Sequence, residues 1–147
     1  MISNYNIHPE VRIKGKDTGC FAGWDTIVLQ LNSIIAKNPK PKKVIVIEYY
    51  QGVNDSEIFN SLIKELNPAV IFNAGEAMLQ ENEIRKITFP DVTDDRIFGF
   101  ITRLSMDDFY DPGKVEALRA KILAIEKGTI LIYGSGAAKV YPDPDLL

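Results

Sequence analysis

The sequence predicts an α/β domain of three layers, in which helices cover both faces of a mostly parallel sheet. Apolar runs rich in Val and Ile alternate along the chain with segments whose apolar residues recur every three or four positions. That alternation is typical of right-handed βαβ units. The chain has 147 residues, of which 46% are hydrophobic and 25% charged, so residues 1–147 are expected to form one globular domain.

The first expected elements lie in the N-terminal third. Residues 10–15 (EVRIKG) allow a short edge strand. A helix with one buried stripe is predicted after Gly23, and the prolines of NPKPKK end it. The stripe consists of Trp24, Ile27, Val28, Leu31, Ile34 and Ile35. Residues 43–50 (KVIVIEYY) then predict a strand that is covered on both faces.

The middle of the chain continues the alternation. A second helix is expected to bury Ile58, Phe59, Leu62, Ile63 and Leu66. Residues 69–79 (AVIFNAGEAML) predict a second strand that runs into a turn or short helix. Residues 96–104 (RIFGFITRL) predict a third strand, in which Gly99 weakens the pairing or marks a close backbone approach.

The C-terminal third predicts one more helix and one more strand. Residues 111–128 are typical of a helix, with Pro112 near its start and Gly128 capping its end. Residues 129–138 (TILIYGSGAA) predict a fourth strand that enters a glycine-containing turn.

Ligands of parallel sheets usually bind beyond the carboxyl ends of the strands. Four loops are therefore expected to share one rim, and they comprise residues 49–55, 73–76, 104–108 and 134–137. Two of them suggest a site for a small ligand. The candidate binding residues are Tyr50, Gly52, Val53 and Asn54 in the first loop, and Gly134, Ser135 and Gly136 in the last.

The first of these loops has the outline of a phosphate loop without its residues. A Walker-type loop reads G-x-x-x-x-G-K-[ST]. When Ser56 takes the place of the final hydroxyl, Asp55 stands at the lysine, and Asn54 and Tyr49 stand at the glycines. A carboxylate at that position repels a triphosphate by roughly 1–4 kcal/mol. The alternatives are a plain helix start with an Asn54–Glu57 capping box, or a non-Walker anion or small-ligand site.

A second group of candidates follows the third predicted strand. SMDDFYDP places Asp107 and Asp108 where they could coordinate magnesium or act as a base toward a substrate hydroxyl. The alternative is a solvated turn in which Asp111 caps the next helix. The run DVTDD, with Asp91, Asp94 and Asp95, is expected to be a surface turn.

Composition excludes several kinds of site. With one histidine, His8, and one cysteine, Cys20, the chain can form neither an internal disulfide nor a zinc site built mainly from these residues. A Ser-His-Asp relay would have to use His8, in a polar N-terminal segment. The net charge of −3 does not favour nucleic acid, and no apolar run reaches the length of a membrane span. A cytoplasmic location is expected.

MDDFYDP and VIVIEYYQGVNDSE together resemble the uridine-kinase branch of the P-loop proteins. In that branch a strand and a phosphate loop come first, and a DDFY motif follows a later strand. The resemblance implies a P-loop NTPase-like topology with a degenerate phosphate loop. In a divergent small-molecule kinase of this type, Asp107 would lie near the reacting hydroxyl, Asp107 or Asp108 would be catalytic, and magnesium would be the cofactor.

A resemblance over most of the chain rests on GCFAGWDTI, IEYYQGV, TDDRIFGF, DDFYDPGKVEALR and ILIYGSGAA. These stretches resemble the N-terminal, uridine-kinase-like region of long bacterial class I mannose-6-phosphate isomerase-like proteins. The resemblance implies a non-catalytic accessory domain of carbohydrate metabolism that binds a sugar phosphate or nucleotide. It further implies an N-terminal fragment of a longer chain, whose zinc and isomerase chemistry belong to a cupin domain. A divergent kinase and a structural docking or dimerisation module are the alternatives.

Overall fold

The computed structural model describes residues 20–147, in which a parallel sheet lies between two layers of helices. The expected edge strand at residues 10–15 and His8 lie outside the described residues. Three strands pair in the order β1-β3-β2, and both pairings are parallel. They are β1 (Lys42–Glu48), β2 (Val70–Asn73) and β3 (Gly128–Gly134). The α/β class and the parallel sheet are therefore confirmed.

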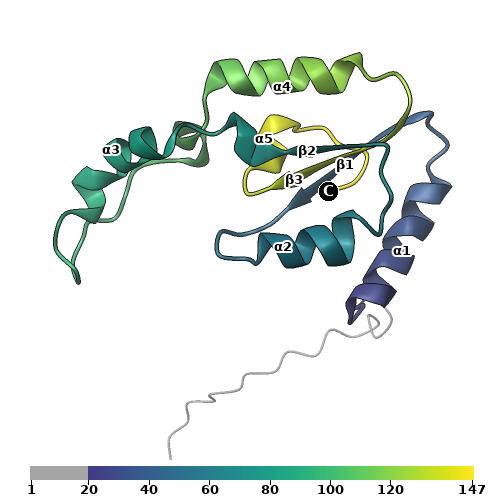
Figure 1. Cartoon of the computed structure of the whole chain (residues 1–147), viewed down its shortest axis with the longest axis horizontal. Helices are drawn as coiled ribbons and strands as arrows, with labels where there is room; N and C mark the ends of the chain where they lie inside the picture. The colour runs from purple at the N-terminus through teal and green to yellow at the C-terminus, as the bar shows by residue number, and fades with distance from the viewer. Residues whose placement is uncertain (1–19) are drawn as a thin grey trace, which may run out of the picture.

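Helices cover both faces of this sheet, and Figure 1 shows α2 and α4 on opposite sides of it. The α-helices are α1 (Trp24–Lys37), α2 (Asp55–Ile58), α3 (Glu81–Val92), α4 (Pro112–Ala124) and α5 (Ala137–Val140). Helix α2 continues as a π-helical turn, η1 (Phe59–Ile63), and two 3₁₀ turns are η2 (Ala74–Ala77) and η3 (Met106–Phe109). Pro112 begins α4 as expected, but Gly128 does not cap it, because α4 ends at Ala124 and Gly128 begins β3.

The core divides between the two faces because successive strand side chains point to opposite sides. One face packs against α4 and α5 and consists of Val44, Val46, Phe72, Ile130 and Ile132. The other face, with Leu131 at its centre, packs against α1 and the α2–η1 helix. The predicted stripe of α1 lies on this face except for Ile34, which is 39% exposed.

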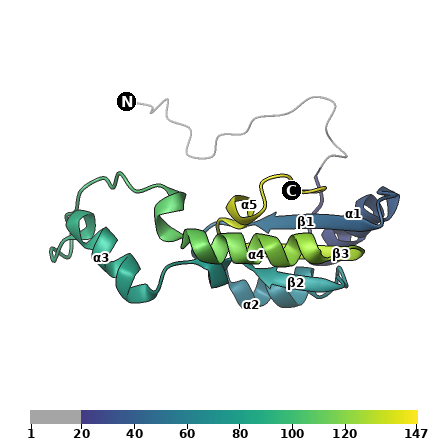
Figure 2. The ribbon, with the colours of Figure 1, turned by 90° about the horizontal axis from the view of Figure 1, so that it is seen from above.

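The predicted third strand at residues 96–104 is wrong. These residues have no strand partner, and they return from a helix, α3, that the sequence analysis did not predict. Residues 81–104 together form an arm that projects from the body (Figures 1 and 2). The arm joins the body through an antiparallel bridge between Met78 and Tyr110. Gly99 does mark a close approach, because a Cβ there would lie 2.6 Å from the carbonyl oxygen of Asp91.

The C-terminal residues pair with the outer edge of β1. The backbone N–H of Asp145 donates to the carbonyl of Val44 at 2.8 Å, and that of Val46 donates to the carbonyl of Leu146 at 2.9 Å. The Asp145 carboxylate also accepts from the Val44 N–H at 2.8 Å and pairs with Lys40 at 2.5 Å. As a result β1 has neighbours on both sides, β3 and residues 145–146.

We expect Asp145→Ala to lower the free energy of unfolding by about 1–2 kcal/mol at pH 7, because it leaves the Val44 N–H without its carboxylate partner. The hydrogen bond from Lys40 holds the pKa of Asp145 below its usual 3.8. A carboxyl whose pKa is lowered by folding stabilises the protein above its unfolded pKa, and this contribution is lost as the pH falls through the folded pKa. Urea unfolding of both proteins should therefore show a difference at pH 7 that shrinks below about pH 4. Asp143→Ala, at an exposed neighbour, is the control and should change stability by under about 0.5 kcal/mol.

Candidate functional site

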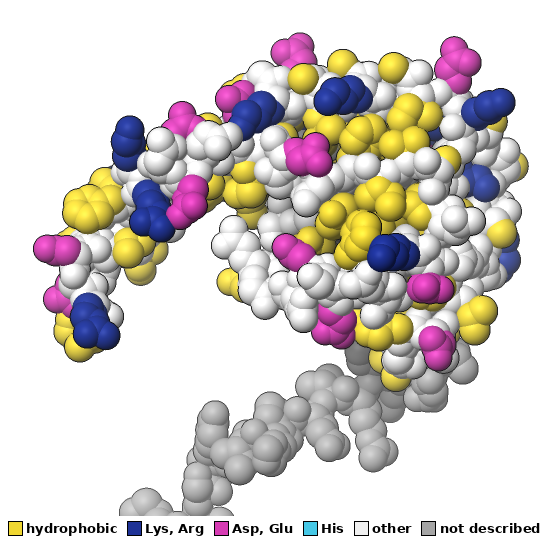
Figure 3. Space-filling view, viewed as in Figure 1, with side chains coloured by type: hydrophobic (Ala, Val, Ile, Leu, Met, Phe, Trp, Pro, Cys, Tyr) yellow, Lys and Arg dark blue, Asp and Glu magenta, His cyan; other side chains and the backbone are white. Residues whose placement is uncertain are grey.

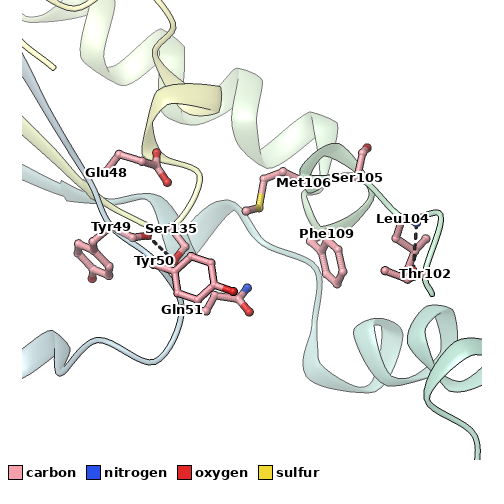
Figure 4. Close-up of a pocket in the computed structure, with 10 residues that line it drawn as sticks. All are labelled: Glu48, Tyr49, Tyr50, Gln51, Thr102, Leu104, Ser105, Met106, Phe109 and Ser135. Carbon is pink, nitrogen blue, oxygen red and sulfur yellow. Dashed lines mark hydrogen bonds between the residues drawn. The ribbon is translucent and has the colours of Figure 1, made fainter. Parts of the chain in front are cut away.

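A cleft of about 660 Å³ opens where the arm returns to the body, beyond the carboxyl ends of β1 and β3. Figure 4 shows Tyr50 and Gln51 on one side of it and Met106 and Phe109 across the gap. The full lining is Glu48, Tyr49, Tyr50, Gln51, Thr102, Leu104, Ser105, Met106, Phe109 and Ser135. The cleft thus combines residues of three segments that are far apart in the sequence.

A smaller hollow of about 300 Å³ shares four of these residues, Tyr49, Tyr50, Gln51 and Ser135. It extends along the first loop and past β2, and its further lining is Gly52, Val53, Asp55, Asn73, Gly75, Met78 and Gly134. All four loops that were expected at one rim contribute to these two hollows, so that expectation is confirmed. The loop before η3 arrives there through the base of the arm and not through a strand end.

The position of the cleft follows from the sheet. Strands β1 and β3 are neighbours, but the chain leaves β1 toward α2 on one face and leaves β3 toward α5 on the other (Figure 1). Loops that diverge in this way leave a crevice between the two strand ends, and this is where open α/β sheets bind their ligands.

Glu48, the last residue of β1, ties the glycine turn after β3 to the sheet. Its carboxylate accepts the backbone N–H of Gly136 at 2.5 Å and that of Ala138 at 2.9 Å. The Ser135 hydroxyl donates to the carbonyl of Tyr49 at 2.9 Å. The predicted ligand residues Gly134, Ser135 and Gly136 therefore lie at the rim, but the Gly136 N–H is already bound by a carboxylate of the chain itself.

Tyr110 holds the same turn from the side of α4. Its hydroxyl donates to the carbonyl of Ser135, and the residue is 6% exposed. Burial, with a smaller contribution from the charge of Glu48, raises the pKa of Tyr110 to about 12. The hydroxyl therefore remains a protonated donor throughout the physiological pH range. Burial likewise raises the pKa of Tyr49, and a hydrogen bond with Asp55 acts in the same direction.

The first loop reaches helix α2 through an ordinary cap. The Asn54 side chain accepts the backbone N–H of Glu57 at 3.3 Å, which confirms the capping interpretation for Asn54. The second half of the expected capping box is wrong, because the Glu57 carboxylate accepts instead from the Trp24 indole at 3.2 Å. Tyr50 is 85% exposed and Val53 39% exposed, and both lie in the loop.

The two aspartates proposed for a kinase lie beside the cleft and not in its lining. Asp107 is 71% exposed at its side chain and pairs with Lys139 at 2.6 Å. Asp108 accepts the Ser105 N–H at 2.7 Å and hydroxyl at 3.0 Å, and the first of these bonds is the main cause of its lowered pKa. Asp111 caps α4 by accepting the Lys114 N–H at 3.0 Å, so the predicted capping role of Asp111 is confirmed.

The charged side chains that line the two hollows are the carboxylates of Glu48 and Asp55. Neither lining contains a lysine or arginine, so no cation there neutralises a phosphate. Across residues 20–147, no three His, Cys, Asp or Glu side chains gather closely enough to hold a metal ion. Within the same span, every helix is too short or too polar to cross a bilayer.

Sequence reasoning missed Glu48, Tyr49, Gln51, Thr102, Leu104, Ser105, Met106 and Phe109 as lining residues. The sequence did contain a signal for Glu48, because this residue is the first charged one after the apolar run Val44–Ile47 and lies near the end of a predicted strand. Tyr49 and Gln51 lie in the first loop expected at the rim, and Leu104, Ser105 and Met106 lie in the third. Thr102 and Phe109 had no signal, because their place at the cleft depends on the path of the arm.

Comparison with known proteins gives one match. Residues 23–147, from the N-cap of α1 to the last residue, match the family described as Domain of unknown function (DUF8485). The chain belongs to this family. No curated protein and no solved structure matches it. The matched span includes the sheet, the arm and every residue of the cleft, so the cleft lies wholly within the family's domain.

Proposed function

We propose that this domain is a non-catalytic binding module whose cleft takes the neutral ring of a sugar or nucleoside. The observation that carries the proposal is the lining itself. Tyr50, which is 85% exposed, stands across the gap from Met106 and Phe109 (Figure 4). Ligand sites in proteins are mostly apolar clefts of about 300–1,000 Å³ with a few polar groups, and this cleft fits that description.

The polar groups of the cleft suit hydroxyls and ring nitrogens better than phosphate. Gln51, Thr102 and Ser105 offer amide and hydroxyl groups, whereas Glu48 and Asp55 supply negative charge. If the ligand is a sugar phosphate or a nucleotide, its phosphate is expected to remain in solvent while the ring enters the cleft. Binding of the ring requires neither magnesium nor zinc.

The non-catalytic part of the proposal rests on the two candidate aspartates. Asp107 pairs with Lys139 and Asp108 caps η3, and neither lines the cleft. The order of β1, the 49–54 loop and α2 supports a P-loop-like topology with its phosphate loop replaced. Under this proposal the domain is an accessory part of a mannose-6-phosphate isomerase-like protein, and the zinc-dependent reaction belongs to a cupin domain in that protein.

The test is titration calorimetry with two matched pairs, uridine against UTP and mannose against mannose 6-phosphate. We expect a neutral compound to bind at least as tightly as its phosphorylated partner. Tyr50→Ala should weaken that binding by roughly 5- to 150-fold, since stacking of a base on an aromatic side chain contributes about 1–3 kcal/mol. Phe21→Ala, at an aromatic residue that is 44% exposed and outside the cleft, should leave it unchanged.

Two results would contradict the proposal. One is the absence of saturable binding by all four compounds. The other is equal binding by the Tyr50→Ala variant and the wild type, which would place the ligand elsewhere.

A further inference from the structure

The arm exposes its large apolar side chains to solvent. Phe89, Val92, Ile97, Phe98, Phe100 and Ile101 are 61%, 62%, 81%, 74%, 74% and 97% exposed. None of residues 81–104 is buried, so the arm has no core of its own. Figure 3 shows hydrophobic side chains along the arm between the charged ones. An exposed apolar surface of this extent is typical of a protein or membrane interaction site.

Hydrogen bonds to Asp95 and Asp91 form a turn at the tip of the arm. The Asp95 carboxylate accepts the backbone N–H groups of Ile97 at 2.8 Å and Phe98 at 2.9 Å. The Phe100 N–H donates to the carbonyl of Asp91 at 2.7 Å, which joins the returning segment to the end of α3. This hydrogen-bonded turn leaves the side chains of Ile97, Phe98 and Phe100 exposed to solvent.

The charge of the arm argues for a protein partner and against a polyanion. Its acidic residues are Glu81, Glu83, Asp91, Asp94 and Asp95, and its basic residues are Arg85, Lys86, Arg96 and Arg103. Five negative and four positive charges give the arm a net charge near −1. Such a surface does not attract nucleic acid or anionic lipid, and two copies of it repel each other only weakly.

The accessible apolar area of the arm is close to the area that each partner buries in a stable dimer. A fully exposed aromatic side chain presents about 150–250 Å², so the three phenylalanines alone leave roughly 300–500 Å² accessible. With Val92, Ile97 and Ile101 the total is on the order of 800 Å², which is what each partner buries in an interface of standard size. Because the arm projects away from the sheet, two arms can lie together while the bodies stay apart (Figure 2).

We propose that the arm is the self-association surface of this protein and that two copies pair arm to arm about a two-fold axis. An isologous interface of this kind would place the apolar side chains of one arm against those of the other. The proposal is independent of the ligand that the cleft takes.

The test is sedimentation equilibrium of the whole chain and of two double variants. Phe98→Glu with Ile101→Glu places four charges in the proposed interface, and the dissociation constant should rise at least about 100-fold. The control is Leu29→Glu with Leu123→Glu, at side chains on α1 and α4 that are 70% and 64% exposed. The control should remain a dimer with an unchanged dissociation constant.

Because the arm contributes no buried residue, the arm variant should fold normally. Its melting temperature should equal that of the wild type at a protein concentration low enough for the wild type to be monomeric. The proposal is overturned if the wild type remains monomeric at every protein concentration up to about 0.1 mM, since standard interfaces bind in the micromolar range or tighter. It is also overturned by an arm variant that still dimerises, or by a control that dissociates in its place.

Discussion

Gly136→Ala is expected to lower the free energy of unfolding by about 2–5 kcal/mol. Gly136 has φ near +79°, and a Cβ there would lie 2.6 Å from the Tyr110 hydroxyl and 2.8 Å from Cε2 of its ring. Left-handed backbone costs a non-glycine residue about 1–2 kcal/mol, and overpacking adds about 1–3 kcal/mol. Tyr110 is held in place by its own hydrogen bond to Ser135, so the ring cannot easily move aside.

The matched control is Gly52→Ala. Gly52 has φ near +94°, but nothing lies within 4 Å of a Cβ at that position. It therefore measures the backbone strain alone, about 1–2 kcal/mol. Urea unfolding followed by circular dichroism compares the two variants, and an equal loss in both would show that the contact with Tyr110 is unimportant. In a Tyr110→Phe background the Gly136→Ala substitution should cost less, because the closest contact is removed.

Glu48→Ala is expected to lower the free energy of unfolding by about 1–2 kcal/mol, because it removes a charged acceptor from two backbone N–H groups, although water can reach this exposed side chain. Gly136, which donates one of these bonds, is buried. Glu48→Gln keeps one oxygen and should lose about half as much, on the same reasoning about charged hydrogen bonds. Denaturant unfolding at pH 7 distinguishes the three proteins.

Glu76→Ala provides the control for charge, since Glu76 is an exposed carboxylate on η2. Its stability should change by less than about 0.5 kcal/mol, as for most surface substitutions. A Glu48→Ala variant that is no less stable than Glu76→Ala would show that the glycine turn is held by Tyr110 and Ser135 alone.

The local elements could be predicted because their signals are local. The Val- and Ile-rich runs gave β1, β2 and β3, and the helical stripe of α1 and the proline start of α4 were identified from spacing and capping chemistry. The rim followed from a general property of parallel sheets. These predictions needed only the chain direction and the order of elements.

The arm could not be predicted in the same way. RIFGFITRL has the composition of a strand, but strand preference reflects packing against neighbouring strands, and no strand pairs with this segment. The sequence carried a weak signal for α3 in the spacing of Gln80 and Glu83 and of Glu81 and Arg85. In the structure Glu83 accepts the Gln80 N–H at 2.9 Å, and Arg85 pairs with Glu81. Pro90 in the last turn of α3 obscured that pattern.

The details of the site depend on contacts between distant residues. Glu48 and Gly136 are 88 residues apart in sequence, and Tyr110 and Ser135 are 25 apart. Nothing in the local pattern indicates that a carboxylate at the end of β1 will occupy the turn after β3. The same limit applies to Asp107, whose partner Lys139 is 32 residues away.

The pairing of residues 145–146 with β1 also bears on how the molecule behaves in a crowded solution. Unpaired edge strands can pair with strands of other molecules, and this pairing is a common route to fibrils and amorphous aggregates. Asp145 and Leu146 occupy the hydrogen-bonding groups of Val44 and the N–H of Val46, so β1 has no free edge there. The ion pair between Asp145 and Lys40 places two charged groups at the same edge. A two-residue segment thus protects the β1 edge of the sheet from intermolecular addition, whereas β2 forms the opposite edge.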